Sequence, residues 1–179
     1  ISDGKYLAGI DVKLSDISLN LDSELKLSGS IIITNNENSA IAIPDISYKI
    51  VASSTMGLSF SQKIVLYNQT TRYTCRLDEK SLNCNHLSTF PLVKLEGKES
   101  KYFTFTKKLF SGDSTIDEYP PDGNYYCFFM YYGIMECPKD HRLRDEGRVW
   151  MGSRKSNTMY VNFDRKKGIT VLNNNVVFE

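Results

Sequence analysis

The sequence predicts an all-β protein folded as an antiparallel β-sandwich, and three observations lead to this prediction. Apolar and polar residues alternate along many short segments, which is the side-chain period of a β-strand. Turn-forming residues separate these segments at short intervals. No segment longer than about ten residues shows a convincing helical period. Many short strands separated by turns are typical of a sandwich or a barrel.

The first strand signal lies at Ile10–Leu14, and a second run, Ile17–Leu21, continues it in the opposite phase. A shift of one residue moves the apolar set to the other face, so we expect a bulge or break near Ser15 and Asp16. The other expected strands are 25–33, 41–43, 46–50, 58–67, 73–75, 101–110, 125–132, 149–151, 159–163 and 169–172.

Turn and loop residues complete the pattern. Asn35–Asn38 predicts a turn, because Asn tolerates positive φ and hydrogen-bonds its own backbone. Pro44 cannot donate to a strand ladder and indicates an edge or a bulge. Residues 78–88 and 111–123 are expected to be loops. We find no repeat, linker or low-complexity tract, and we expect one sandwich domain over residues 1–179.

The segment Gly123–Cys127 resembles part of the immunoglobulin pattern. Tyr125 lies two residues before Cys127, which is the arrangement of a tyrosine corner, and Cys75 lies at a plausible distance for a cysteine in the facing sheet. The chain departs from that family because Pro121 stands where an Asp is usual and no Trp follows Cys75 at the expected distance. The resemblance implies an immunoglobulin-like sandwich in the loose architectural sense.

Cysteines and a sequon indicate the compartment. The even number of cysteines and the absence of a C-x-x-C spacing favour disulfides over zinc, and the four are Cys75, Cys84, Cys127 and Cys137. The alternative is that all four are buried free thiols of a cytosolic protein. Asn68-Gln69-Thr70 is an N-glycosylation sequon. We expect a secreted or extracellular disulfide-bonded glycoprotein modified at Asn68. Because a glycan cannot be buried, we expect Asn68 to be exposed at a strand end or loop outside any binding face. Local closure predicts the pairs Cys75–Cys84 and Cys127–Cys137, with Cys75–Cys127 as the alternative.

Charge is unevenly distributed. The chain carries 22 basic and 21 acidic residues, which argues against a nucleic-acid partner. Residues 139–167 nevertheless hold nine basic residues against four acidic ones. We expect this segment to contact an anionic or acidic partner through Arg142, Arg144, Arg148, Trp150, Arg154 and Lys155. The alternative is that Trp150 belongs to the core and the arginines are solvated.

Six of the eight residues from Tyr125 to Tyr132 are aromatic, on both faces of the expected strand. Either a loop covers the second face, or the rings form an exposed platform suited to a protein or a sugar. We find no catalytic motif and expect no enzyme activity, cofactor, metal or membrane span. The leading hypothesis is a recognition module that binds another protein. The alternatives are a carbohydrate-binding domain and a secreted effector or toxin subunit.

Overall fold

The computed structural model describes residues 9–21, 26–46, 63–69, 71–76, 92–108, 110–111, 120–133, 149–150 and 152–178. Within these residues the protein is all-β and contains no helix, as the sequence predicts. The strands are β1 (Ile10–Asn20), β2 (Lys26–Asn35), β3 (Ile41–Pro44), β4 (Lys63–Tyr67), β5 (Arg72–Arg76), β6 (Leu92–Leu95), β7 (Ser100–Lys108), β8 (Phe110–Ser111), β9 (Gly123–Tyr132), β10 (Ser153–Lys155), β11 (Met159–Asp164) and β12 (Gly168–Asn173).

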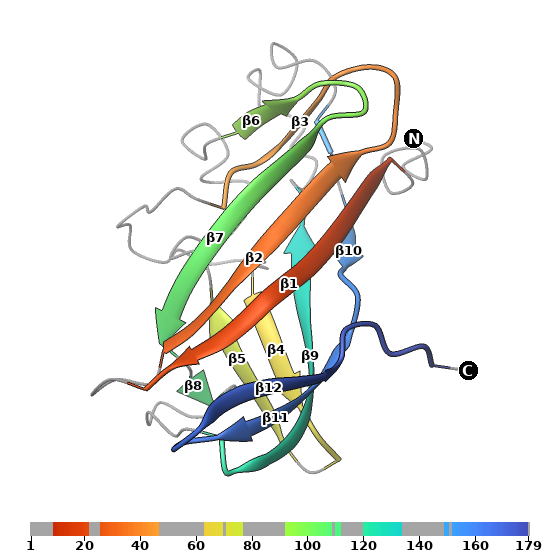
Figure 1. Ribbon diagram of the computed structural model, residues 1–179. Coiled ribbons are helices and arrows are strands. Elements are labelled where there is room, and N and C mark those ends of the chain that lie inside the picture. Colours follow the sequence, from red (N-terminus) through yellow and green to blue (C-terminus); the bar gives the residue numbers. More distant parts are fainter. Residues whose placement is uncertain are drawn as a thin grey trace, which may run out of the picture.

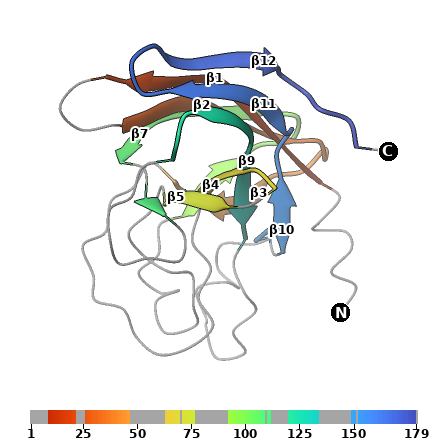
Figure 2. The ribbon, with the colours of Figure 1, turned by 90° about the horizontal axis from the view of Figure 1, so that it is seen from below.

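The strands pair antiparallel in three sheets (Figure 1). One sheet has the order β1-β2-β7, and the largest has the order β12-β11-β9-β4-β5-β8, with β10 also paired to β9. The third is the pair β3-β6. Figure 2 shows β1, β2 and β7 on one side of the molecule and β4, β5 and β9 on the other. At one end the large sheet brings β12 beside β1.

The inner faces of the two larger sheets share one hydrophobic core. Ile31 of β2 and Phe129 of β9 are both fully buried in it. The strands supply these residues by alternation: β2 buries every second residue along its whole length, so one face packs and the other meets solvent.

Strand β1 contains the irregularity that its sequence predicts. The register with β2 shifts between Ser15 and Ser18, and Asp16 has a φ of 55°. A short polar side chain tolerates this left-handed conformation, so the extra residue is absorbed there. Ile17 then points inward again and is buried.

Tyr125 makes the hydrogen bond that the predicted tyrosine corner requires. Its hydroxyl donates to the carbonyl of Pro121, four residues upstream, at 2.6 Å. The ring is buried, and its edge packs against Phe163 with the centroids 6.3 Å apart. The entry into β9 is therefore fixed by a side chain that reaches back over the loop.

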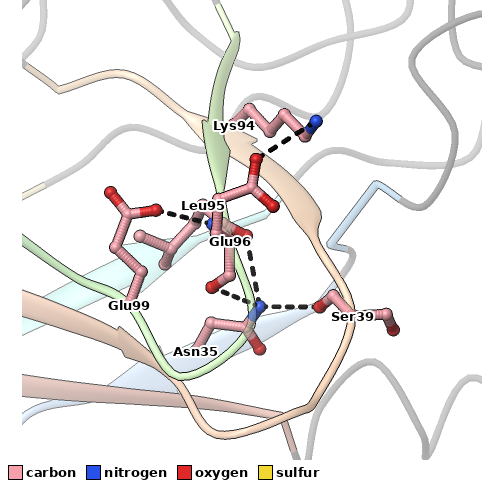
Figure 3. Close-up of polar contacts among 6 residues, drawn as sticks. All are labelled: Asn35, Ser39, Lys94, Leu95, Glu96 and Glu99. Carbon is pink, nitrogen blue, oxygen red and sulfur yellow. Dashed lines mark hydrogen bonds and ion pairs between the residues drawn. The ribbon is translucent and has the colours of Figure 1, made fainter.

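Two turns at one end of the molecule are joined by Asn35 (Figure 3). The fully buried amide nitrogen donates to the carbonyls of Ser39, Leu95 and Glu96 at 2.9, 3.2 and 3.1 Å. The amide oxygen accepts from the backbone N–H of Glu37 at 3.0 Å. One side chain thus satisfies carbonyls on both sides of the junction between the β2–β3 and β6–β7 turns.

Asn157 links the two larger sheets. It lies between β10 and β11, and its side chain accepts from the backbone N–H of Leu14 at 2.8 Å while donating to the Leu14 carbonyl at 3.1 Å. It also donates to the Asn174 carbonyl at 2.8 Å. The backbone N–H of Val176 donates to the Thr158 carbonyl at 2.7 Å. These bonds hold the C-terminal segment 174–178 along the sheet.

Some strand predictions differ from the structure. Of the expected strand at 149–151, Val149 forms an isolated bridge with Ala42, Trp150 belongs to no strand, and residue 151 lies outside the described residues. Strands β6 and β10 were not expected from the sequence; each has only three or four residues, too few for a clear period. Pro44 ends β3 in a two-stranded pair, which agrees with an edge position. Residues 47–50 and 58–62 of the expected strands lie outside the described residues.

Candidate functional site

Three tyrosines stand side by side on the outer face of the large sheet. Tyr126 of β9 is paired in register with Tyr67 of β4 on one side and with Tyr160 of β11 on the other. All three are only partly buried, because the alternate residues of these strands face the core. We call Tyr67, Tyr126 and Tyr160 the tyrosine row.

The rings of the tyrosine row contact one another. The centroid of Tyr126 lies 5.3 Å from that of Tyr67 and 4.9 Å from that of Tyr160. Both separations fall within the range of about 4.5–7 Å in which aromatic pairs attract. The phenol groups are therefore held in place by their neighbours before any ligand arrives.

A pocket of about 360 Å³ opens beside the row. It is lined by Tyr126 and Tyr160 of the row and by three residues whose side chains carry amides, Asn68, Gln69 and Asn124. Its size lies near the lower end of the range of about 300–1,000 Å³ found for small-ligand pockets.

A hydrogen bond between two neighbouring strands orients the amide of Asn124, one of the lining residues. Asn162 is the register partner of Asn124, and its amide nitrogen donates to the Asn124 amide oxygen at 2.9 Å. This bond leaves Asn124 exposed but fixes the plane of its amide. The pair forms the next row of the outer face after Tyr126 and Tyr160.

Asn68 stands in the turn that joins β4 to β5. Its backbone N–H donates to the carbonyl of Thr71 at 3.0 Å, and its amide oxygen accepts from the backbone N–H of Thr71 at 2.9 Å. Asn and Asp form such local bonds readily, which suits them to turns. Asn68 therefore lies directly after β4, at a strand end as the sequence predicts. It is only partly exposed and it lines the pocket, which differs from the expected position outside any binding face.

Burial raises the pKa of the Tyr67 hydroxyl, and the neighbouring Tyr126 raises it further, while Arg72 acts in the opposite direction. The Tyr67 hydroxyl therefore stays protonated through neutral and mildly alkaline pH and can donate a hydrogen bond there.

The other outward rings of β9 are partly covered. The Lys155 ammonium lies 4.4 Å from the ring centroid of Phe128, which is buried. Phe178 in the C-terminal segment places its ring centroid 5.4 Å from that of Tyr126. Phe128 is thus covered by a side chain of the neighbouring strand β10 rather than by a loop, and Tyr126 is partly buried.

The residues predicted from the basic segment are not brought together in the described part of the chain. Arg142, Arg144 and Arg148 lie outside the described residues. Lys155 is exposed, and its ammonium group makes the cation–π contact with Phe128. Arg154 is partly buried, and its Nε has no hydrogen-bond partner among the described residues.

Trp150 is fully buried and stacks on Tyr131 with centroids 5.0 Å apart and an interplanar angle of 8°. Its position agrees with the alternative interpretation, in which it belongs to the core. The ring has no exposed surface with which to contact a partner.

Cys75 and Cys127 do not occupy facing sheets, which corrects the expectation drawn from the immunoglobulin resemblance. Both belong to the large sheet, on β5 and β9, and β4 runs between them. Two strand spacings separate their backbones by about 10 Å, and a disulfide needs Cα atoms within about 7 Å. Both are buried and occur as thiols in this structure, while Cys84 and Cys137 lie outside the described residues.

The comparisons give no relative from which to transfer a function. The chain matches no protein-family model, no curated protein and no solved structure. Among the described residues, no group of histidine, cysteine, aspartate or glutamate side chains is arranged to hold a metal ion. No helix in that part of the chain is long and apolar enough to cross a bilayer.

Proposed function

We propose that this protein is a secreted or cell-surface, non-enzymatic recognition domain that binds carbohydrate in the pocket beside the tyrosine row. The observation that carries the proposal is the combination of two tyrosine rings with three amide side chains around one small pocket. Carbohydrate recognition was an alternative at the level of the sequence, and this combination makes it the preferred function.

The rings suit the apolar faces of a sugar. The C–H bonds of a pyranose ring carry partial positive charge, and the face of an aromatic ring is negative, so the two attract. The rings of Tyr126 and Tyr160 already contact each other, so little side-chain freedom is lost on binding.

The amides suit the hydroxyl groups. Each Asn or Gln side chain offers both donors and an acceptor, which matches a hydroxyl that can also do both. The lining contains no carboxyl, imidazole, amine or guanidinium side chain. The lining therefore supports binding rather than proton transfer.

For the fold, we propose an immunoglobulin-like sandwich. The support is that two antiparallel sheets share one core and that Tyr125 makes the tyrosine-corner bond to Pro121. Secretion is supported by the sequon at Asn68.

A glycan array probed with unglycosylated protein tests the proposed function. We expect binding to a defined group of saccharides and its loss in Tyr126→Ala. Tyr102→Ala is the matched control, because Tyr102 is also an outward tyrosine but stands on β7 of the other sheet and is 72% exposed. An array without any saturable signal contradicts the proposal.

An acidic protein partner is a second candidate, favoured by the C-terminal segment. Val177 and Phe178 are 79% and 56% exposed, and the Lys155 ammonium lies 5.8 Å from the Phe178 ring centroid. Exposed aromatic residues beside cations are common at protein interfaces.

A panel of cell-surface proteins would be screened for a partner. Changing Arg142, Arg144 and Arg148 to Glu should abolish binding while leaving the melting temperature nearly unchanged. A partner that still binds this triple variant contacts the protein elsewhere.

A further inference from the structure

Asn68 has two properties that bear on each other. It is the acceptor asparagine of the sequon Asn68-Gln69-Thr70, and it also lines the pocket beside the tyrosine row. A sugar attached to its side chain therefore begins at the edge of the pocket.

The turn fixes the direction in which an attached sugar would extend from the Asn68 side chain. The amide oxygen of Asn68 accepts the Thr71 N–H at 2.9 Å, so the plane of the amide is set and Nδ2 points away from that bond. The same pocket is lined elsewhere by Tyr126, Tyr160 and Asn124.

We propose that an N-linked glycan on Asn68 lays its first N-acetylglucosamine in this pocket, against Tyr126 and Tyr160, and thereby closes the site to other saccharides. The inference rests on the proposed function to the extent that the pocket accepts a sugar ring. It adds the identity of the sugar and a form of regulation, because glycosylation then decides whether the site is open.

The modification itself is an ordinary group transfer. A polyprenyl-pyrophosphate-linked oligosaccharide donates its anomeric carbon to Nδ2 of Asn68. The new C–N bond replaces the C–O bond to pyrophosphate, the amide loses one proton, and the polyprenyl pyrophosphate leaves. Thr70 completes the sequon that this transfer requires.

N-acetylglucosamine suits the lining for a specific reason. Its acetamido group presents an N–H donor and a carbonyl acceptor, the same pair of groups that the side chains of Gln69 and Asn124 present. Its pyranose ring presents C–H bonds to the tyrosine faces. Because the sugar is tethered, its effective concentration at the pocket reaches the millimolar range or above, so it excludes a free saccharide of modest affinity.

The experiment compares protein from a eukaryotic secretory host with protein from bacteria that do not glycosylate it. Thr70→Ala removes the sequon but leaves Asn68 and all five lining residues in place, and Thr70→Ser is the matched control that keeps the sequon. An endoglycosidase that leaves a single N-acetylglucosamine on Asn68 gives a trimmed form. The free probe is tri-N-acetylchitotriose, titrated while the tyrosine ring resonances are followed by NMR.

We expect the bacterial protein and secreted Thr70→Ala to bind the probe, and the glycosylated, trimmed and Thr70→Ser forms to bind it at least tenfold more weakly. In the glycosylated and trimmed forms the Tyr126 and Tyr160 ring resonances should already be shifted without probe. The single remaining sugar should raise the melting temperature, and this increase should vanish in Tyr126→Ala and shrink in Tyr160→Ala.

Each contrary result has a distinct meaning. Equal probe binding by glycosylated and unglycosylated protein overturns the inference and leaves carbohydrate recognition standing. Unshifted tyrosine resonances in the trimmed form, or an unmodified Asn68 in the secreted protein, also overturn it. If the trimmed form shows the shifts but no form binds the probe, the sugar lies in the pocket only as a structural element and the regulation is rejected, whereas the proposed function is decided by the glycan array.

Discussion

The rings of Tyr126 and Tyr160 lie with their centroids 4.9 Å apart, and the same two residues are opposite each other in the pairing of β9 with β11. Backbone pairing thus places two rings on one wall of the pocket. A slip of one residue between these strands would turn one ring toward the core. The site therefore depends on the register of the sheet.

The tyrosine corner gives the first prediction. Tyr125→Phe keeps the buried ring and removes the hydroxyl that donates to the Pro121 carbonyl. We expect a loss of about 1 kcal/mol in the free energy of unfolding, the usual net value of one hydrogen bond. Urea denaturation measures it, with Tyr102→Phe as an exposed control that should change nothing. A Tyr125→Phe protein as stable as the wild type would show that the bond contributes no stability.

The amide of Asn35 gives a larger predicted effect. Asn35→Ala removes the donor to three backbone carbonyls at a buried position and the acceptor for the Glu37 N–H. Each buried group left unsatisfied costs about 1–3 kcal/mol, so we expect a loss of about 3 kcal/mol or more. Asn36→Ala is the neighbouring control, because the Asn36 side chain bonds Asp11 at the exposed surface. Equal losses in the two variants would contradict the role given to Asn35.

The thiols give a pH dependence for the reduced protein. Burial raises the pKa of both Cys75 and Cys127 to about 12 from an ordinary value of 9.0. A folded-state pKa above the unfolded one gives stability that is complete below pH 9 and is lost as the pH rises toward 12. Each thiol contributes a slope of up to about 1.4 kcal/mol per pH unit in this range.

Urea titrations at several alkaline pH values, in the presence of reductant, measure this slope. Cys127→Ala removes one thiol and should make the slope shallower. Ultraviolet absorbance of the thiolate provides an independent readout. A thiolate that forms near pH 9 in the folded protein would contradict the burial of these groups.

Disulfide pairing is the fourth prediction. The intervening strand β4 keeps Cys75 and Cys127 too far apart to pair, which leaves two possible pairings. We choose Cys75–Cys84 with Cys127–Cys137 for the secreted protein, because these pairs close short loops. Peptide mapping under non-reducing conditions identifies the pairs. A Cys75–Cys127 peptide would contradict the strand order, whereas a Cys75–Cys137 peptide would contradict only the local pairing.

Local sequence patterns predicted some features of the fold and could not predict others. The phase change at Ser15 and Asp16 predicted the bulge, because the alternation of apolar residues reports directly which side of a strand faces the core. The spacing of Tyr125 and Cys127 led to the expectation of a hydroxyl bond back to the upstream backbone, and Tyr125 donates such a bond to the Pro121 carbonyl. Each of these two signals comes from residues that are close together in the sequence.

The candidate site had no such local signal. Tyr67, Tyr126 and Tyr160 come from three strands far apart in the sequence, and only the strand order and register bring them together. The aromatic run at 125–132 pointed to Tyr126 alone. The placement of Cys75 in the same sheet as Cys127 was missed for the same reason.

A titration of unglycosylated protein with tri-N-acetylchitotriose tests the central claim most directly. Calorimetry would compare the wild type, Tyr126→Ala and the control Tyr102→Ala, after urea denaturation confirms that each is folded. We predict saturable binding by the wild type and by Tyr102→Ala, and binding at least tenfold weaker in Tyr126→Ala, because the central ring of the tyrosine row forms part of the pocket wall. No saturable binding by the wild type, or equal binding by all three proteins, would contradict the account.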